Sequence, residues 1–188
     1  EQYNYTEGLY IGQRWFNKQN IKPVFPFGFG LSYTTFNYSD LKVNMKKEGL
    51  ICEFKIKNTG SFKGKAVPML FLSFPDSIGD YPKYIFKGYE KVDLNPLEEK
   101  EVKIIVDEHA LSYFNVEKND YVRINDGKIK VYIAENGDPN EEAKLTAEVS
   151  TVGNKSSLLI IFIVCGAVIG LLVIFLVFCL IHYILKKK

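Results

Sequence analysis

The 188-residue sequence predicts an all-β fold, a β-sandwich, followed by a single transmembrane α-helix. Two observations lead to this prediction. From residue 40 to residue 150, short stretches that alternate apolar and polar residues follow one another with turn residues between them. Residues 158–185 then contain no Asp, Glu, Lys or Arg, and this run exceeds the roughly 20 apolar residues that cross a bilayer.

About eight strands are expected at short, regular spacing, which is typical of a β-sandwich. The clearest alternation runs through residues 50–57, so one face of that strand is expected to be buried. The side chains expected to point into the core are Leu50, Cys52, Phe54, Ile56, Val131 and Ile133, and those expected to point outward are Ile51, Lys55 and Lys130. The remaining strands are expected at residues 41–45, 67–74, 84–92, 100–106, 121–124, 128–134 and 143–150, with one helical turn near residues 109–113.

One turn carries a specific prediction. Residues 121–124 and 128–134 flank Asn125, Asp126 and Gly127, which are residue types that tolerate positive φ. The sequence therefore predicts a β-hairpin between these two strands.

Three lysines, Lys186 to Lys188, follow the apolar run directly. Because basic residues stay on the cytoplasmic side of a span, we expect residues 1–157 to lie outside, extracellular or luminal, and residues 186–188 to form a cytoplasmic stub. Residues 151–157 are then a juxtamembrane linker. A glycolipid-anchor signal is the alternative, although such tails seldom end in a lysine cluster. Gly166 and Gly170 are spaced for close helix packing and are candidates for a weak homodimer contact within the bilayer.

Charge and residue counts exclude several function classes. The 24 basic and 22 acidic residues give a net charge of +2, and three of the lysines belong to the tail, so the outer part is nearly neutral. Nucleic acid is not an expected partner, because its binding needs a clustered basic face. The two histidines, His109 and His182, lie far apart, and two of the three cysteines fall within the apolar run. We therefore expect no metal site, no cofactor and no disulfide framework.

Two sequons are candidates for N-glycosylation of an exported domain. They are Asn4-Tyr5-Thr6 and Asn37-Tyr38-Ser39. A third, at Asn154, lies four residues from the apolar run and is expected to be too close to the bilayer for easy modification. The predicted topology requires export, yet no export signal precedes Glu1, so the chain is expected to be the C-terminal piece of a longer protein.

Residues 1–39, here called the aromatic segment, are dense in Tyr, Phe and Gly and show no sustained periodicity. Pro23, Pro26, Gly28 and Gly30 are expected to interrupt any helix or long strand. So many aromatic rings are poorly placed in water, and packing against a neighbouring domain is the favoured interpretation. A platform on which sugars stack is the alternative.

Five motifs, in a specific order and spacing, resemble one family. They are residues 4–16 (NYTEGLYIGQRWF), 26–36 (PFGFGLSYTTF), 57–60 (KNTG, with Gly64-Lys65 following), 86–92 (FKGYEKV) and 110–114 (ALSYF). Together they cover roughly residues 3–136 and closely resemble the C-terminal part of glycoside hydrolase family 3 β-glucosidases. The resemblance implies that residues 1–39 are the tail of that family's α/β sandwich domain and that residues 40–150 form a fibronectin type III-like, immunoglobulin-like β-sandwich. Gln13, where a Tyr is common, and Leu97-Glu98, in place of a Gly-containing turn, depart from the family pattern.

The resemblance does not extend to catalytic residues. The family places an Asp nucleophile and a Glu acid/base upstream of these motifs, and a retaining glycosidase needs two carboxyl groups about 5 Å apart. The acidic clusters around Glu98 and Glu135 are expected to be solvated surface groups. We therefore expect a membrane-anchored accessory portion of a β-glucosidase-like protein of carbohydrate breakdown, partnered by upstream catalytic domains and inactive alone. The alternative is a stand-alone cell-surface binding or adhesion module that recognises glycans or protein partners.

Overall fold

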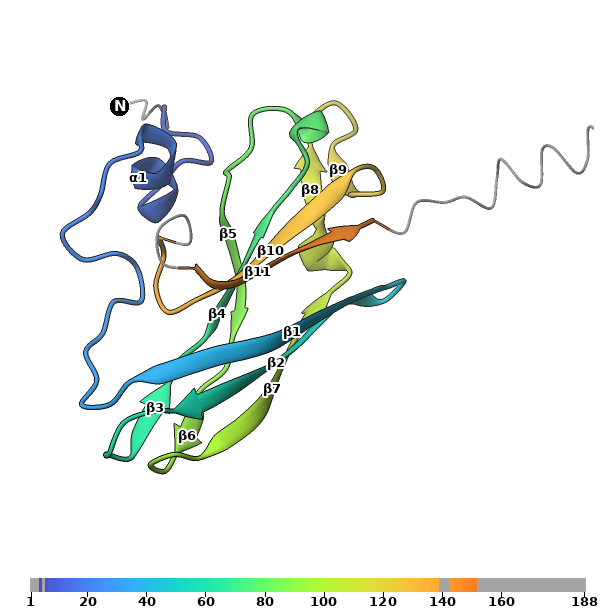
Figure 1. Cartoon of the computed structure of the whole chain (residues 1–188). Helices are drawn as coiled ribbons and strands as arrows, with labels where there is room; N and C mark the ends of the chain where they lie inside the picture. Colours follow the sequence, from blue (N-terminus) through green and yellow to red (C-terminus); the bar gives the residue numbers. More distant parts are fainter. Residues whose placement is uncertain (1–3, 5, 139–142, 152–188) are drawn as a thin grey trace, which may run out of the picture. The chain divides into compact units, whose positions relative to one another are not determined.

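Two facing antiparallel sheets form most of the structure, a computed structural model that describes residues 4, 6–138 and 143–151 (Figure 1). The first sheet has the order β1-β2-β7. Its strands are β1 (Phe36–Lys46), β2 (Gly49–Asn58) and β7 (Glu99–Asp107). The second sheet has the order β11-β10-β4-β5. Its strands are β4 (Met69–Ser73), β5 (Ile85–Tyr89), β10 (Lys128–Ala134) and β11 (Ala143–Ser150).

Shorter elements occupy the ends of the sandwich. β3 (Gly64–Ala66) pairs with β6 (Val92–Leu94), and β8 (Ser112–Asn115) pairs with β9 (Asp120–Arg123). Two single-turn 3-10 helices, η1 (Asp76–Ile78) and η2 (His109–Leu111), connect strands, and η2 lies where a helical turn was expected. The α-helix α1 (Gln13–Gln19) precedes the sheets.

The inward and outward positions expected from the alternation are confirmed. The side chains of Leu50, Cys52, Phe54 and Ile56 on β2 are buried, whereas Ile51 and Lys55 are only half-buried. Val131 and Ile133 on β10 are fully buried and Lys130 is exposed. The register is therefore correct, since a slip of one residue would exchange the two faces. The Cys52 thiol lies in this core, and burial raises its pKa to about 12, so it is chemically inert.

The strand β4 is buried on both faces, which explains why residues 67–74 are apolar without alternation. Leu70 and Leu72 face the main core between the sheets. Met69 and Phe71 face the other side, where they form a second apolar cluster with Tyr84 and Ala134. This cluster lies on the outer face of the second sheet, and the aromatic segment packs there.

The structure corrects the hairpin predicted around Asn125-Asp126-Gly127. β9 pairs with β8, whereas β10 pairs with β4 and β11 in the second sheet. The turn residues are present, and Gly127 has a φ of 81°, but they carry the chain from one sheet to another. Turn composition predicts a reversal of the chain, and it does not determine which strands then pair.

Three further boundaries differ from those expected. The segment expected as one strand at residues 84–92 divides into β5 and β6, which belong to different sheets. The first strand begins at Phe36, five residues earlier than expected. No helix was expected before residue 40, yet α1 forms between Gly12 and Asn20, a residue in the left-handed conformation that ends helices.

Among the described residues, no helix is long and apolar enough to cross a membrane. The expected span at 158–185, its Gly166 and Gly170, the juxtamembrane Asn154 and the lysine stub all lie outside the described residues.

Candidate functional site

The aromatic segment is the candidate site, and its first attachment to the sandwich is Asp80. The Tyr10 hydroxyl donates a hydrogen bond to the Asp80 carboxylate, and Lys18 Nζ lies 3.2 Å from Asp80 Oδ2. Lys18 Nζ also lies 3.5 Å from the centre of the Tyr10 ring, a cation–π contact. One carboxylate on the loop after η1 therefore fixes both the start of the segment and α1. These two hydrogen bonds hold the pKa of Asp80 below its usual range, the Tyr10 bond being the larger cause.

The second attachment is an aromatic contact on the outer face of the second sheet. Phe27 meets Phe86 of β5 edge to face, with ring centroids 5.4 Å apart. The Phe27 carbonyl accepts a hydrogen bond of 2.6 Å from the Gly137 N–H. Gly28 follows with a φ of 75°, and a Cβ there would overlap the Met69 side chain. The chain can lie this close to the second apolar cluster only with glycine at that position.

The third attachment is a buried polar junction between the end of the segment and the end of β2. Thr34 and Asn58 are the two buried polar residues of the described chain. The Thr34 hydroxyl donates to Asn58 Oδ1, which also accepts from the Gly60 N–H at 3.0 Å. Asn58 Nδ2 donates to the Leu94 carbonyl at 3.2 Å and to the Phe62 carbonyl at 2.8 Å. The amide is thus satisfied on both sides, as burial requires.

Two motifs far apart in sequence meet at this junction. The Thr59 N–H donates to the Thr35 carbonyl at 2.8 Å, and the two threonine hydroxyls lie 2.7 Å apart. A Cβ at Gly60 would lie 2.3 Å from Thr34 Oγ1, and one at Gly64 would lie 2.4 Å from Thr34 Cγ2. The LSYTTF and KNTG motifs, with Gly64, are therefore the two sides of one tightly packed contact.

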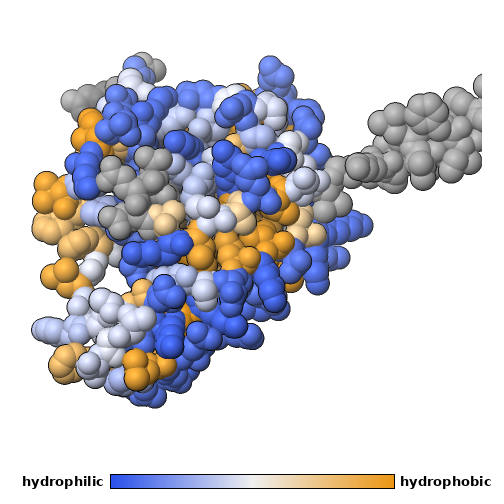
Figure 2. Space-filling view, in the orientation of Figure 1, coloured by the Kyte–Doolittle hydropathy of each residue, from blue (hydrophilic) through white to orange (hydrophobic). Residues whose placement is uncertain are grey.

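Between these attachments the segment presents most of its apolar side chains to solvent. Figure 2 shows apolar residues gathered at the edge where Figure 1 places the chain between α1 and β1. Leu31 is 92% exposed and Tyr33 96% exposed. Other exposed side chains of the segment are Leu9, Ile11, Trp15, Phe16, Ile21, Val24, Phe25, Phe27 and Phe29. An apolar surface of this density on a segment fixed at three points is typical of an interface.

A second apolar region lies at the open side of the sandwich, where the edge strands β1 and β11 face each other (Figure 2). Leu41 and Val43 of β1 and Leu145 and Val149 of β11 are half-buried there and pack against the main core. This region is the exposed rim of the core.

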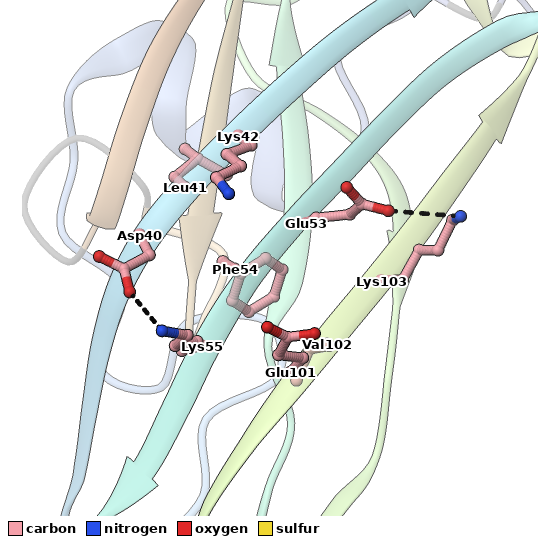
Figure 3. Close-up of a pocket in the computed structure, with 9 residues that line it drawn as sticks. All are labelled: Asp40, Leu41, Lys42, Glu53, Phe54, Lys55, Glu101, Val102 and Lys103. Atoms are coloured by element: carbon pink, nitrogen blue, oxygen red, sulfur yellow. Dashed lines mark ion pairs between the residues drawn. The ribbon is translucent and has the colours of Figure 1, made fainter.

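A hollow of about 600 Å³ lies across β1, β2 and β7 (Figure 3). Its carboxylates have basic partners: Asp40 pairs with Lys55 at 2.9 Å and Glu53 with Lys103 at 3.4 Å. The hydrogen bond to Asp40 is the main cause that raises the pKa of Lys55. This charge ladder on a solvated sheet face has the geometry of cross-strand ion pairs rather than of a catalytic pair.

Some carboxyl groups of the described chain have pKa values outside their ordinary range. In the described residues, these are Asp80, Glu98 and Glu148, and the pKa of each is lowered. The Glu98 shift comes first from the Asn95 N–H, which donates to its carboxylate at 2.7 Å. A glycosidase acid needs a raised pKa. No group of three or more His, Cys, Asp or Glu in the described part could hold a metal ion.

The two candidate glycosylation sites, Asn4 and Asn37, are both exposed. Asn37 lies on β1 with Lys57 as its cross-strand neighbour. Their use stays a prediction. The His109 ring contacts the Tyr121 ring at a tilt, with ring centroids 4.5 Å apart.

Acid is expected to release α1 from the sandwich. Because the Asp80 pKa is lower in the folded than in the unfolded chain, the attachment stabilises the fold above the unfolded pKa of about 3.9 and is lost as pH falls through the folded value. Trp15 lies on α1 and is the single tryptophan of the chain. Its fluorescence in residues 1–157 should therefore change at acidic pH while the far-ultraviolet circular dichroism of the sheets persists.

Asp80→Asn should remove this acidic transition, since the variant carries no titrating group at the attachment. Glu148→Gln is the matched control, because Glu148 also has a lowered pKa but pairs with Lys128 on the second sheet. An Asp80→Asn titration identical to that of the native chain would contradict the assignment.

Sequence reasoning found the aromatic segment but not what holds it. The tertiary partners Asp80 and Phe86 carry no sequence signal of their own. The sequence does contain one signal for the buried junction. Asn58 ends an apolar strand and is followed by Thr-Gly, and an asparagine is a poor core residue unless its amide is hydrogen-bonded. Seven residues free of Gly and Pro between Gly12 and Asn20 were the signal for α1.

The chain is similar in sequence to a known domain family and to β-glucosidases. Residues 66–136 match the fibronectin type III-like domain family. The chain is 38% identical over 133 residues to thermostable beta-glucosidase B of Acetivibrio thermocellus, and 38% identical over 134 residues to beta-glucosidase BoGH3A of Bacteroides ovatus. Each alignment covers 69% of this chain and 18% of the relative.

Solved structures of beta-glucosidases are also similar to this chain. Beta-glucosidase 3B from Thermotoga neapolitana, in complex with glucose, superposes with a TM-score of 0.72 at 34% identity, covering 80% of this chain and 20% of that one. A beta-glucosidase from Kluyveromyces marxianus gives a TM-score of 0.71 at 32% identity, with 78% and 18% covered. The chain therefore spans about a fifth of the length of the proteins it matches.

Proposed function

We propose that this chain, which carries a fibronectin type III-like domain and is similar to the C-terminal region of glycoside hydrolase family 3 β-glucosidases, is the accessory portion of a β-glucosidase-like hydrolase. In this role it binds and braces catalytic domains encoded upstream and holds them at a membrane. The catalytic carboxyl groups belong to those upstream domains, and these residues alone hydrolyse no glycoside.

One observation carries the proposal: the exposed apolar side chains are concentrated on residues 9–33, a segment that the sandwich itself holds in place. A free surface of this kind is unfavourable in water. Attachment at Asp80, Phe86 and Asn58 fixes the segment before any partner arrives, which lowers the entropic cost of docking. The upstream part of the same protein is the partner that fits, because it is covalently continuous with the segment.

The membrane role rests on sequence. Residues 158–185 are long and apolar enough to span a bilayer, and the lysines that follow favour an outward-facing domain. The exposed sequons at Asn4 and Asn37 fit an exported glycoprotein. A weak homodimer through Gly166 and Gly170 is part of the same proposal.

The test begins with the transcript upstream of Glu1. We expect it to encode a barrel and an α/β domain, and an export signal directly preceding Glu1 would contradict the proposal.

In the whole protein, Leu31→Ser with Tyr33→Ser should lower β-glucoside hydrolysis and the melting temperature of the catalytic part. Leu97→Ser with Ile105→Ser is the matched control, since these residues are also exposed, at 69% and 65%, but lie outside the segment. Equal effects of the two pairs would also contradict it.

A second candidate function is a surface module that binds glycans through the same segment. The observation that favours it is that Trp15 and Phe25, at 45% and 70% exposed, present rings on which sugars stack. Titration of residues 1–157 with soluble β-glucan oligosaccharides separates the two functions. Saturable quenching of Trp15 would favour the binding module.

A further inference from the structure

We propose that the β8–β9 hairpin rests on the lipid headgroup layer of the membrane, with Phe114, Val116 and Tyr121 as its contact residues. This inference rests on the membrane anchorage proposed above and extends it. Anchorage alone leaves the domain free to tumble on its linker, whereas a contact through the hairpin determines which end of the sandwich faces the lipid.

The first step is the position at which the described chain leaves the sandwich. The backbone N–H and the hydroxyl of Thr151 both donate to the Gly127 carbonyl at 3.2 Å, so the end of β11 is fixed beside the β9–β10 connection. Leu158 lies seven positions after Thr151 in the sequence. A fully extended chain of that length spans about 25 Å. With residues 158–185 in the bilayer, as proposed above, the length of this linker limits the distance between Thr151 and the membrane.

The second step is that the hairpin lies at this same end. Arg123, the last residue of β9, is four residues before Gly127. Its guanidinium donates to the carbonyls of Lys46 and Lys47 in the turn between β1 and β2 and pairs with Glu108 at 2.6 Å. Figure 1 shows the hairpin, this turn and the end of β11 on the same side of the sandwich.

The third step is the surface that the hairpin presents. Phe114 is 47%, Val116 83% and Tyr121 53% exposed. The Phe114 and Tyr121 rings meet edge to face with centroids 5.4 Å apart, and the His109 ring contacts Tyr121 at a tilt. Outside residues 9–33, no other strand or turn of the described chain exposes more than one large apolar residue. Tyrosine, with its apolar ring and polar hydroxyl, is a residue type enriched at membrane interfaces, and here Tyr121 lies beside the apolar Phe114.

Charge determines the kind of lipid. The basic residues around this end are outnumbered by acidic ones: Lys46, Lys47, Lys118, Arg123 and Lys128 against Glu48, Asp107, Glu108, Glu117, Asp120 and Asp126. Attraction to an anionic surface is therefore not the source of the contact. Zwitterionic phosphatidylcholine is sufficient, and added salt does not weaken the contact, because it depends on burying apolar side chains.

The experiment uses the full chain in phosphatidylcholine vesicles. Val116→Cys is labelled with an environment-sensitive fluorophore in a Cys165→Ala, Cys179→Ala background, where the buried Cys52 does not react. The matched control is Leu97→Cys, which is 69% exposed in the turn before β7. It lies at the opposite end of that nine-residue strand, about 30 Å away. Brominated lipids should quench the label at residue 116 about twofold and leave the label at residue 97 unchanged.

A second measurement needs no substitution. Hydrogen exchange of residues 112–123 should be slower in the vesicle-bound chain than in residues 1–157 free in solution, with residues 95–98 equal in both. Protection of the hairpin in solution by added oligosaccharide would overturn the proposal in favour of a glycan site.

Flotation of the vesicles separates the two possible failures. A chain that floats with the vesicles, but whose labels at residues 116 and 97 respond equally, would overturn the hairpin contact and leave the anchorage standing. A chain that stays in the aqueous fraction would overturn both.

Discussion

Replacing Asn58 with alanine is expected to lower the free energy of unfolding of residues 1–157 by about 3–5 kcal/mol. The side chain is fully buried, and its amide pairs with Thr34, Gly60, Phe62 and Leu94. Truncation leaves these groups without partners and opens a cavity. Denaturant unfolding, followed by circular dichroism and by Trp15 fluorescence, measures the loss.

Two variants show whether the junction itself is responsible. Asn44→Ala changes an exposed asparagine on β1 and should shift the unfolding free energy by less than about 0.5 kcal/mol. Thr34→Val keeps the shape but removes one donor, and should cost about 1–2 kcal/mol. An Asn58→Ala variant as stable as the Asn44→Ala variant would show that the buried amide contributes nothing.

The junction has a consequence for function. Thr34 lies between the exposed Leu31 and Tyr33 and the start of β1, so it holds the apolar surface of the aromatic segment against the sandwich. The Asn58→Ala substitution is therefore expected to disturb a surface that it does not touch. Under the proposed function, stability and docking are expected to be linked at this position, because the same hydrogen bonds hold the sandwich together and fix the apolar surface.

Local patterns predicted the features that depend on neighbouring residues. The register of β2 followed from the alternation of Leu50, Cys52, Phe54 and Ile56, because a strand exposes one face to water. The apolar run around β4 predicted a strand, and burial on both faces explains why it showed no alternation. The family resemblance predicted a sandwich of the type that the structure and the comparisons support.

Features set by distant contacts were not predicted. Asn125-Asp126-Gly127 indicated a turn, but β9 pairs with β8 and not with β10. Packing across the whole fold decides which strands pair. The helix α1 is too short for periodicity and is held by Tyr10, Lys18 and Asp80 rather than by its own propensity. For the same reason the sequence indicated an aromatic surface without showing its three attachments.

We expect residues 1–157, assayed with an aryl β-glucoside, to release product at the rate of buffer alone. Enzymatic glycoside hydrolysis exceeds the uncatalysed rate by at least about six orders of magnitude, so the assay discriminates sharply. The measurement is product release over hours at several pH values, with a whole β-glucosidase as the positive control. Turnover that disappears on substitution of a single acidic residue of this chain would contradict the expectation.

The physical reason lies in the environment that each carboxylate needs. Retaining hydrolysis requires one carboxyl group kept protonated in an apolar site and a second one ionised about 5 Å away, with a sugar between them. Here the Asn95 N–H stabilises the ionised form of Glu98, and the Lys128 ammonium does the same for Glu148. Both carboxyl groups therefore lose their protons more readily than a free glutamate and are ionised at neutral pH, where a general acid has to be protonated. Replacing a partner, for instance with Lys128→Ala, would return the pKa of Glu148 toward its ordinary value but not above it, because neither carboxyl group is buried.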